Sequence, residues 1–221
     1  MTGSSRRILI AGATGHVGKQ ILTQLLADAS VSHVYALGRR APSIEHPKLM
    51  PILTDFSKVA SVPAVDEVYL ALGTTMRLAG SEAAFRAVDF DAVYVSAQAA
   101  LAAGAKRAGL VSAVDAAPAS RFFYNRVKGE IETALRALPF DALVIARPSM
   151  LLGTRGDEGR AESWVERLSA KLLPGVARWV PSAYRPIGPE AVARALTHWV
   201  PRAHGVKWLA SGEMLDMKAA G

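Results

Sequence analysis

A tyrosine and a lysine lie four residues apart in the segment Tyr124-Asn125-Arg126-Val127-Lys128. Residues at positions i and i+4 share one face of a helix, so the phenol and the ammonium are neighbours if this segment is helical. A nearby positive charge favours the phenolate, which makes the phenol a group that can give and take a proton. The pair therefore suggests proton transfer to a carbonyl or from an alcohol, although a surface Tyr–Lys pair has the same spacing.

The position of the pair in the chain supports the chemical interpretation. Ser112 ends an apolar segment that we expect to be a strand, twelve residues before Tyr124. Its hydroxyl could hold the oxygen of a substrate while Tyr124 moves the proton. Another predicted strand follows the helix that carries Tyr124 and Lys128. The candidate catalytic set is therefore Ser112, Tyr124 and Lys128.

A glycine-rich loop near the start of the chain has the spacing Gly12-x-x-Gly15-x-x-Gly18, after a predicted strand and before a predicted helix. We expect Gly12 to permit a tight turn, Gly15 to let the backbone approach a pyrophosphate, and Gly18 to let the helix pack close to the strand. The amides at the helix start would face the phosphates. Thr14 can add a hydroxyl, and His16 either lines the phosphate site or points to solvent.

Two arginines indicate which dinucleotide the loop would hold. The second predicted strand ends in Leu37-Gly38-Arg39-Arg40, with no acidic residue to bind a ribose 2′-hydroxyl. Arginine accommodates a 2′-phosphate instead, through charge-assisted hydrogen bonds. Arg39 and Arg40 therefore favour NADP over NAD, and solvated surface arginines are the alternative.

Composition narrows the class of protein. The 221 residues are 51% hydrophobic and 20% charged, which is typical of a globular domain, and no apolar run approaches the 18 residues of a membrane span. The net charge is +7, but the basic residues are scattered, so we expect no nucleic-acid partner. The five histidines lack ligand spacing and cysteine is absent, so we expect no metal site. The lack of cysteine fits a reducing compartment, and we expect a cytoplasmic protein.

Strand and helix patterns alternate along the first 150 residues. This alternation predicts an α/β fold with a doubly wound parallel sheet, the Rossmann fold. We expect one domain over residues 1–221, with a small cap over 151–188 that folds across the carboxyl edge of the sheet. The predicted strands are Arg7–Ala11, His33–Leu37, Leu49–Leu53, Glu67–Leu72, Arg107–Ser112, Ala142–Ala146 and Val206–Ala210, and the predicted helices are Gly18–Ala29, Glu82–Ala103, Phe122–Leu138, Ala161–Leu173 and Pro189–Val200.

These motifs together resemble the short-chain dehydrogenase/reductase superfamily, in its atypical or extended branch. The loop Gly12-Ala13-Thr14-Gly15-His16-Val17-Gly18 is similar to that of the branch, so Val17 joins the expected cofactor contacts. The resemblance implies that Asp55-Phe56 lies beside the adenine and that Leu72-Gly73-Thr74 passes the ribose. It implies that Pro148 borders the nicotinamide and that Lys128 also binds the ribose. One departure is that Ala113 follows Ser112, without a second serine.

A narrower group is similar over three further segments. Leu37-Gly38-Arg39-Arg40, Leu72-Gly73-Thr74-Thr75 and Val127-Lys128-Gly129-Glu130 resemble the Tat-interacting-protein-like oxidoreductases. The resemblance implies NADP binding without a settled substrate. The first hypothesis is an NADP-dependent oxidoreductase acting on a small carbonyl or alcohol. The alternative is a non-catalytic NADP(H) sensor that binds a protein partner. The sequence does not indicate the oligomeric state.

Overall fold

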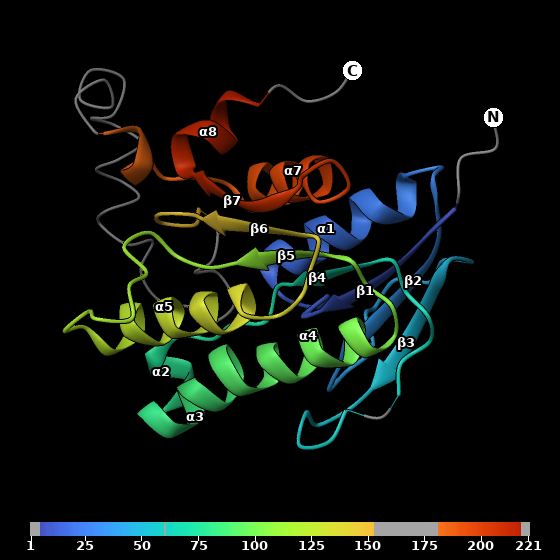
Figure 1. Ribbon diagram of the computed structural model, residues 1–221, viewed down its shortest axis with the longest axis horizontal. Helices are drawn as coiled ribbons and strands as arrows, with labels where there is room; N and C mark the ends of the chain where they lie inside the picture. The colour runs from blue at the N-terminus through green and yellow to red at the C-terminus, as the bar shows by residue number, and fades with distance from the viewer. Residues whose placement is uncertain (1–4, 60, 153–180, 218–221) are drawn as a thin grey trace.

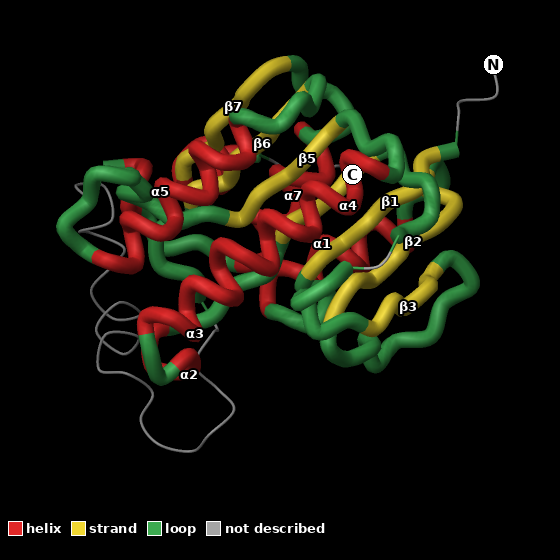
Figure 2. Tube along the Cα trace, turned by 60° about the horizontal axis from the view of Figure 1, so that its bottom comes forward, coloured by secondary structure: helices red, strands yellow, loops and turns green. Residues whose placement is uncertain are grey.

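The computed structural model describes residues 5–59, 61–152 and 181–217 of the chain. Seven strands in these residues form one parallel sheet in the order β3-β2-β1-β4-β5-β6-β7 (Figure 2). From β1 the chain runs outward to β3, crosses back to β4 on the other side of β1, and continues outward to β7. This doubly wound order confirms the predicted Rossmann fold. The strands are β1 (Arg6–Ala11), β2 (Val31–Gly38), β3 (Leu49–Leu53), β4 (Glu67–Leu70), β5 (Arg107–Val111), β6 (Ala142–Arg147) and β7 (Gly205–Ala210).

Helices cover both faces of the sheet (Figure 1). On one face α1 (His16–Ala27) packs beside α7 (Pro189–Trp199), and on the other face lie α4 (Val93–Ala102) and α5 (Phe123–Arg136). Each helical layer seals a separate apolar core, which explains why the central strands are near-continuous apolar runs. The helical side chains of the two cores include Ile21, Leu25, Val192 and Leu196 on one face and Val93, Ala97, Ile131 and Leu135 on the other.

The long helix predicted over Glu82–Ala103 is divided into three parts in the structure. A short helix, α3 (Glu82–Arg86), leads into a π-helical turn, η1 (Ala87–Ala92), and then into α4. A π turn accommodates an additional residue and so changes the direction in which side chains point. The alanine-rich pattern predicts helix but carries no signal for this change of hydrogen-bond spacing. Three further short elements were also not predicted, α2 (Met76–Ala79), η2 (Ser182–Tyr184) and α8 (Ser211–Asp216).

Much of the expected cap, including the predicted helix Ala161–Leu173, lies outside the described residues. Residues 181–188 of the expected cap are described, and they contact the segment that follows β6. Ile187 forms a β-bridge with Leu151, and its N–H donates to the carbonyl of Met150 at 3.0 Å. The boundaries of the cap and the single domain over residues 1–221 stay predictions. No helix within the described ranges is long and apolar enough to cross a membrane.

Candidate active site at the carboxyl edge of the sheet

The glycine-rich loop joins β1 to α1, and its three glycines have different reasons to be glycine. Gly12 has φ +92°, and a Cβ there would lie 2.6 Å from the backbone of Ala71. A Cβ on Gly18 would lie 2.0 Å from the carbonyl oxygen of Gly12, so α1 crosses the loop in direct contact. At Gly15 the nearest atom to a Cβ is the Gly12 oxygen at 3.4 Å. The fold thus requires Gly12 and Gly18, whereas a side chain at Gly15 would enter the space outside the loop.

The start of α1 is suited to hold an anion. Gly15 is the N-cap, and the first bond of the helix runs from the N–H of Lys19 to the carbonyl of Gly15 at 2.8 Å. The N–H groups of His16, Val17 and Gly18 come before this bond and have no acceptor within the helix. Such amides, together with the helix dipole, bind phosphate groups. The open space at Gly15 therefore fits the pyrophosphate of a dinucleotide.

Side chains around this helix start are mostly exposed. Thr14 and His16 are both exposed. His16 and Lys19 line a cleft of about 430 Å³ together with Pro189 and Glu190 from the start of α7. His16 therefore lies at the surface, at the start of α1, rather than inside the protein.

The adenine side of the expected site is formed by the loops after β2 and β3. Arg39 and Arg40 follow β2 directly, and both are exposed. The carboxylate of Asp55 accepts hydrogen bonds from the hydroxyl and the N–H of Ser57, at 2.7 and 2.9 Å, and these bonds lower the pKa of Asp55. Phe56 adopts φ +66°, a left-handed conformation that turns the chain sharply after Asp55.

Helix α5 carries Tyr124 and Lys128, with both residues on one face. Tyr124 lies in the first turn and is 37% exposed, and its ring packs 5.5 Å from that of Phe85. Lys128 lies one turn further on and is only 5% exposed. The phenol is therefore accessible, whereas the ammonium is enclosed.

A buried carboxylate neutralises the ammonium. The Nζ atom of Lys128 lies 2.7 Å from Oδ1 of Asp89, whose side chain is fully buried on the π-helical turn η1. The other oxygen of Asp89 accepts the N–H of Thr74 at 2.8 Å. A Cβ on Gly73 would lie 3.8 Å from the ammonium nitrogen. The structure therefore brings Lys128 to the segment Leu72–Thr74 that follows β4.

Ser112 is placed differently from the expectation. It lies just after β5 and is 4% exposed, and its hydroxyl donates to Oε1 of Glu132 at 2.5 Å. Glu132 also accepts two bonds from the guanidinium of Arg147, at the end of β6. To hold a substrate oxygen, as the sequence predicts, the hydroxyl would have to release Glu132. In the structure it belongs to a charged network beneath the site.

The loop between β5 and α5 is held from two sides. The carbonyl of the buried Pro148 accepts the N–H of Val114 at 2.9 Å. The hydroxyl of Tyr184 donates to Asp115 at 2.9 Å, and this bond raises the pKa of Tyr184. These contacts tie the loop that precedes Tyr124 to the segment after β6 and to the C-terminal part of the chain.

Sequence reasoning missed Asp89 and Glu132, the two buried carboxylates of the site. Glu132 could have been found, because it lies four residues after Lys128 and therefore on the same face of α5. Asp89 had a weaker signal, an acid within the mostly apolar segment Ala87–Ala92. Its partner is 39 residues away in the chain, and only the π turn brings it there.

Comparisons with known proteins agree with this geometry. Residues 12–166 match the family described as NAD(P)H-binding. The chain is 32% identical over 212 residues to the mitochondrial protein FMP52 of Lodderomyces elongisporus, covering 90% of this chain and 88% of that protein. It is 36% identical over 177 residues to the protein HTATIP2 of Rattus norvegicus, covering 77% and 72%. A solved oxidoreductase of the short-chain dehydrogenase/reductase family from Burkholderia thailandensis shares the fold, with a TM-score of 0.67, 20% identity, and 96% and 93% of the two chains covered.

These relatives correct one expectation and establish the family. Several FMP52 proteins among them are named as mitochondrial, so the predicted cytoplasmic location is wrong. That prediction rested on the absence of cysteine, which excludes disulfides but does not distinguish one reducing compartment from another. Fold, glycine loop and relatives agree on a nicotinamide dinucleotide as the cofactor. The chain therefore belongs to the NAD(P)H-binding family, and FMP52 and HTATIP2 are among its relatives.

Proposed function

We propose that this protein is an NADP(H)-dependent reductase or dehydrogenase that acts on a small carbonyl or alcohol. The observation that carries the proposal is the arrangement on α5. An exposed phenol, Tyr124, lies one turn from Lys128, whose ammonium reaches the segment Gly73–Thr74. A phenol and a lysine one helical turn apart thus lie at the carboxyl edge of the sheet, where ligands bind in such folds.

The residues would divide the work as follows. Tyr124 donates its phenolic proton to the carbonyl oxygen during reduction and takes it back from the alcohol during oxidation. Lys128 holds the ribose and supports the phenolate that remains. The amides of His16, Val17 and Gly18 hold the pyrophosphate, and Leu72–Thr74 and Pro148 border the ribose and the ring. When bound, the nicotinamide supplies or accepts the hydride.

Two side chains support NADP in preference to NAD. Arg39 and Arg40 follow β2 with no acidic residue between them and the strand, and both are exposed. A 2′-phosphate carries negative charge and accepts paired hydrogen bonds from a guanidinium. An acidic residue at this place would repel the phosphate.

A cofactor-sensing protein without turnover is the second candidate, and two contacts favour it. The hydroxyl of Ser112 already donates to Glu132, and the charge of Lys128 is already compensated by Asp89. A sensor would hold NADP(H) and present a surface to a protein partner. Tyr124 would then serve packing against Phe85 rather than chemistry.

A turnover screen separates the two candidates. Oxidation of NADPH is followed by absorbance with a library of small aldehydes and ketones, next to direct titration of NADPH binding. An oxidoreductase consumes NADPH with at least one carbonyl. Tight binding without consumption by any member of the library would reject the enzyme in favour of the sensor.

A further inference from the structure

The two outer strands of the sheet differ in whether a further strand can pair with them. In the order of the sheet these strands are β3 and β7, and no described strand lies beyond either of them (Figure 2). An outer strand presents N–H and C=O groups to which an extended chain can bind. In a parallel pair, alternate residues bond to the inner neighbour, and the residues between them face outward.

The edge at β3 is closed by a proline. The N–H of Val34 in β2 donates to the carbonyl of Lys48 at 2.8 Å, so the even-numbered residues of β3 bond inward. The odd-numbered residues face outward, and Pro51 lies at the centre of their row. Because proline has no N–H, a strand laid along β3 would meet no donor at this point.

The edge at β7 has no such block. The N–H of Gly205 donates to the carbonyl of Asp141 at 2.9 Å, so the odd-numbered residues of β7 bond to β6 and the even-numbered ones face outward. Val206 and Trp208 therefore present their N–H and C=O groups outward, and no described residue bonds to these groups. Their side chains are 39% and 40% exposed. These two residues form the open edge.

The open edge is short and positively charged. The next outward N–H, that of Ala210, already donates to the carboxylate of Glu213 at 2.9 Å. Between the two open residues lies Lys207, whose Nζ is 4.1 Å from the ring centroid of Trp199 on the α7 face of the sheet. A strand that pairs with the open edge therefore places one side chain opposite Lys207 and its neighbours beside the two exposed apolar side chains.

We propose that the open edge of β7 binds an extended segment of another protein, in which one acidic residue lies between two apolar residues. The segment pairs antiparallel to β7. Its backbone bonds to Val206 and Trp208, its apolar side chains cover theirs, and its carboxylate pairs with the ammonium of Lys207.

A second copy of this chain fits the open edge less well. An antiparallel pair that uses both open residues of each copy sets Val206 of one copy against Trp208 of the other. The same register sets the two Lys207 side chains opposite each other, and like charges in opposite positions are destabilising.

Short blocked peptides test the proposal. The peptide Thr-Val-Glu-Val-Thr is titrated at millimolar concentration into the isotope-labelled protein, and amide chemical shifts and hydrogen exchange are followed. We expect shifts centred on Val206 and Trp208 and slower exchange of these two amides. Two matched peptides serve as controls. Lysine in place of the glutamate should weaken binding, and methylation of both valine nitrogens should abolish it, because it removes the backbone donors.

A charge reversal in the protein completes the test. Lys207→Glu should shift the preference between the glutamate and lysine peptides by about tenfold, toward the lysine peptide. Arg202→Glu changes the net charge equally at an exposed position after α7 and should leave the preference unchanged. Circular dichroism confirms that both variants are folded, and Lys207→Gln, which should remove the preference, replaces Lys207→Glu if that variant does not fold.

The proposal is overturned if the glutamate peptide shifts no amide of β7, or if the lysine peptide binds the wild type equally well. It is also overturned if sedimentation shows a dimer of the wild type whose dissociation on dilution exposes the amides of Val206 and Trp208, since a second copy would then occupy the edge. None of these measurements uses NADPH or turnover, so their outcome is independent of the proposed function.

Discussion

At the scale of single residues, Gly15 and Gly18 differ in why each is a glycine: Gly18 is required for folding, and we expect Gly15 to be required for cofactor binding. A side chain at Gly15 first meets an atom at 3.4 Å, which is ordinary contact, whereas at Gly18 it would meet the Gly12 oxygen at 2.0 Å. The two glycines share one loop and one helix but differ in what a side chain would displace. At Gly15 the side chain would enter the space where we expect the pyrophosphate, and at Gly18 it would displace the helix.

We expect Gly15→Val to abolish NADP(H) binding while the protein remains folded, because the added side chain occupies the space of the pyrophosphate. Gly18→Val is the matched control and should lower the melting temperature sharply or prevent folding. Circular dichroism and a fluorescence titration of NADPH measure the two effects. A folded Gly15→Val protein with normal binding would show that the loop does not hold the phosphates.

The two exposed arginines after β2 are expected to select the cofactor. NADP(H) should bind at least tenfold tighter than NAD(H), a difference of about 1.4 kcal/mol. Arg39→Ala and Arg40→Ala should reduce this ratio, and Arg202→Ala, an exposed arginine after α7, should leave it unchanged. Titration of both cofactors with each variant provides the measurement. Equal affinities in the wild type would contradict the assignment.

Most of the residues at the candidate site could be predicted from sequence because their reasons are local. Each of three features can be recognised from a few neighbouring residues. They are the glycine with φ +92°, the i,i+4 pair on α5, and the strand that is followed by Arg39. The environment of Ser112 cannot be recognised in this way. Its hydroxyl donates to Glu132, 20 residues away in the chain, whereas its place at the end of a predicted strand suggested a hydroxyl available to a substrate.

Helix α5 depends on a close contact at the level of elements. A Cβ on Gly129 would lie 2.2 Å from the carbonyl carbon of Ala117, so the helix packs directly on the loop that links it to β5. Lys128 is the neighbour of Gly129, and Tyr124 lies in the first turn of the same helix. The packing of this glycine therefore sets the position of both side chains relative to the sheet.

Gly129→Ala is expected to destabilise the protein by about 1–3 kcal/mol, the usual cost of overpacking. For a chain of this size each kcal/mol lowers Tm by about 2–4 °C. Thr133→Ala, on the exposed side of the same helix, removes only a hydroxyl bonded to the helix's own Gly129 carbonyl and should change Tm little. Calorimetry of the two variants gives the comparison. A Gly129→Ala protein as stable as Thr133→Ala would mean that the loop between β5 and α5 can shift to accommodate the methyl group without loss of stability.

The helices and strands could be predicted where the pattern of apolar residues is regular over a long segment. Each of the seven predicted strands is present, and Leu49–Leu53 has the same bounds in the structure. The division of Glu82–Ala103 was not predictable, because alanine fits α- and π-helical turns equally. The decisive residue there, Asp89, takes its meaning from Thr74 and Lys128, which no local pattern connects to it.

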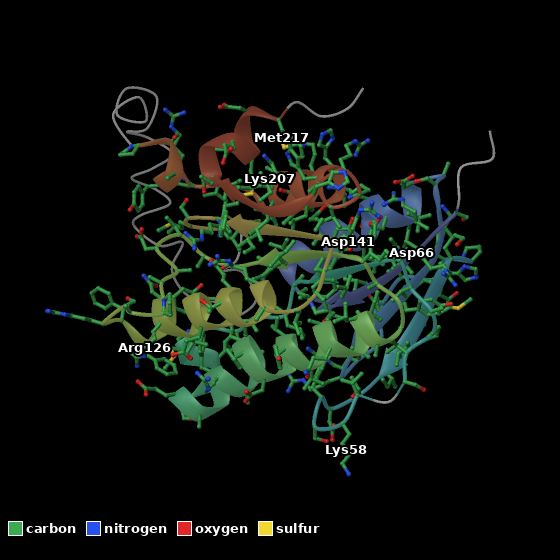
Figure 3. All side chains as sticks on the ribbon, viewed as in Figure 1. Lys58, Asp66, Arg126, Asp141, Lys207 and Met217 are labelled. Carbon is green, nitrogen blue, oxygen red and sulfur yellow. The ribbon has the colours of Figure 1, made fainter. Side chains whose placement is uncertain are left out.

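The ends of the sheet have different roles at the scale of the whole molecule. The carboxyl edge holds the candidate site, and the amino edge holds a group of ion pairs. Figure 3 shows Asp66 at one end of the sheet and Arg126 of α5 at the other. At the amino edge Arg6 contacts Asp28 at 2.5 Å and Glu67 at 3.0 Å, and Arg7 contacts Asp66 at 3.2 Å.

These contacts make stability depend on pH at the acid end. Partial burial opposes ionisation of Asp28, but hydrogen bonds from Ser30 and the charge of Arg6 outweigh it and lower the pKa of Asp28. The pKa of Asp66 is lowered in the same way by Arg7. A carboxyl group whose pKa is lower in the folded state stabilises the fold above its unfolded pKa, about 3.9, and this stabilisation is lost as the pH falls toward the folded value.

Asp28→Asn should therefore lower Tm at pH 7, and the difference from the wild type should shrink as the pH falls below about 4. The effect is modest, since the side chain of Asp28 is 39% exposed and screened by solvent. The exposed Asp216 supplies the control, and Asp216→Asn should show no such narrowing. Thermal unfolding between pH 7 and pH 2.5 measures this. A difference that stays constant over that range would exclude the Asp28 carboxylate as its source.

The central claim, that Tyr124 transfers the proton in a nicotinamide-dependent reduction, is tested most directly by Tyr124→Phe. The change keeps the ring against Phe85 and removes only the hydroxyl. With a carbonyl that the wild type reduces, kcat should fall by about 10²–10⁴, the range for loss of a positioned acid, while the affinity for NADPH stays nearly unchanged. A Tyr124→Phe protein that reduces the same carbonyl at the wild-type rate would contradict the account.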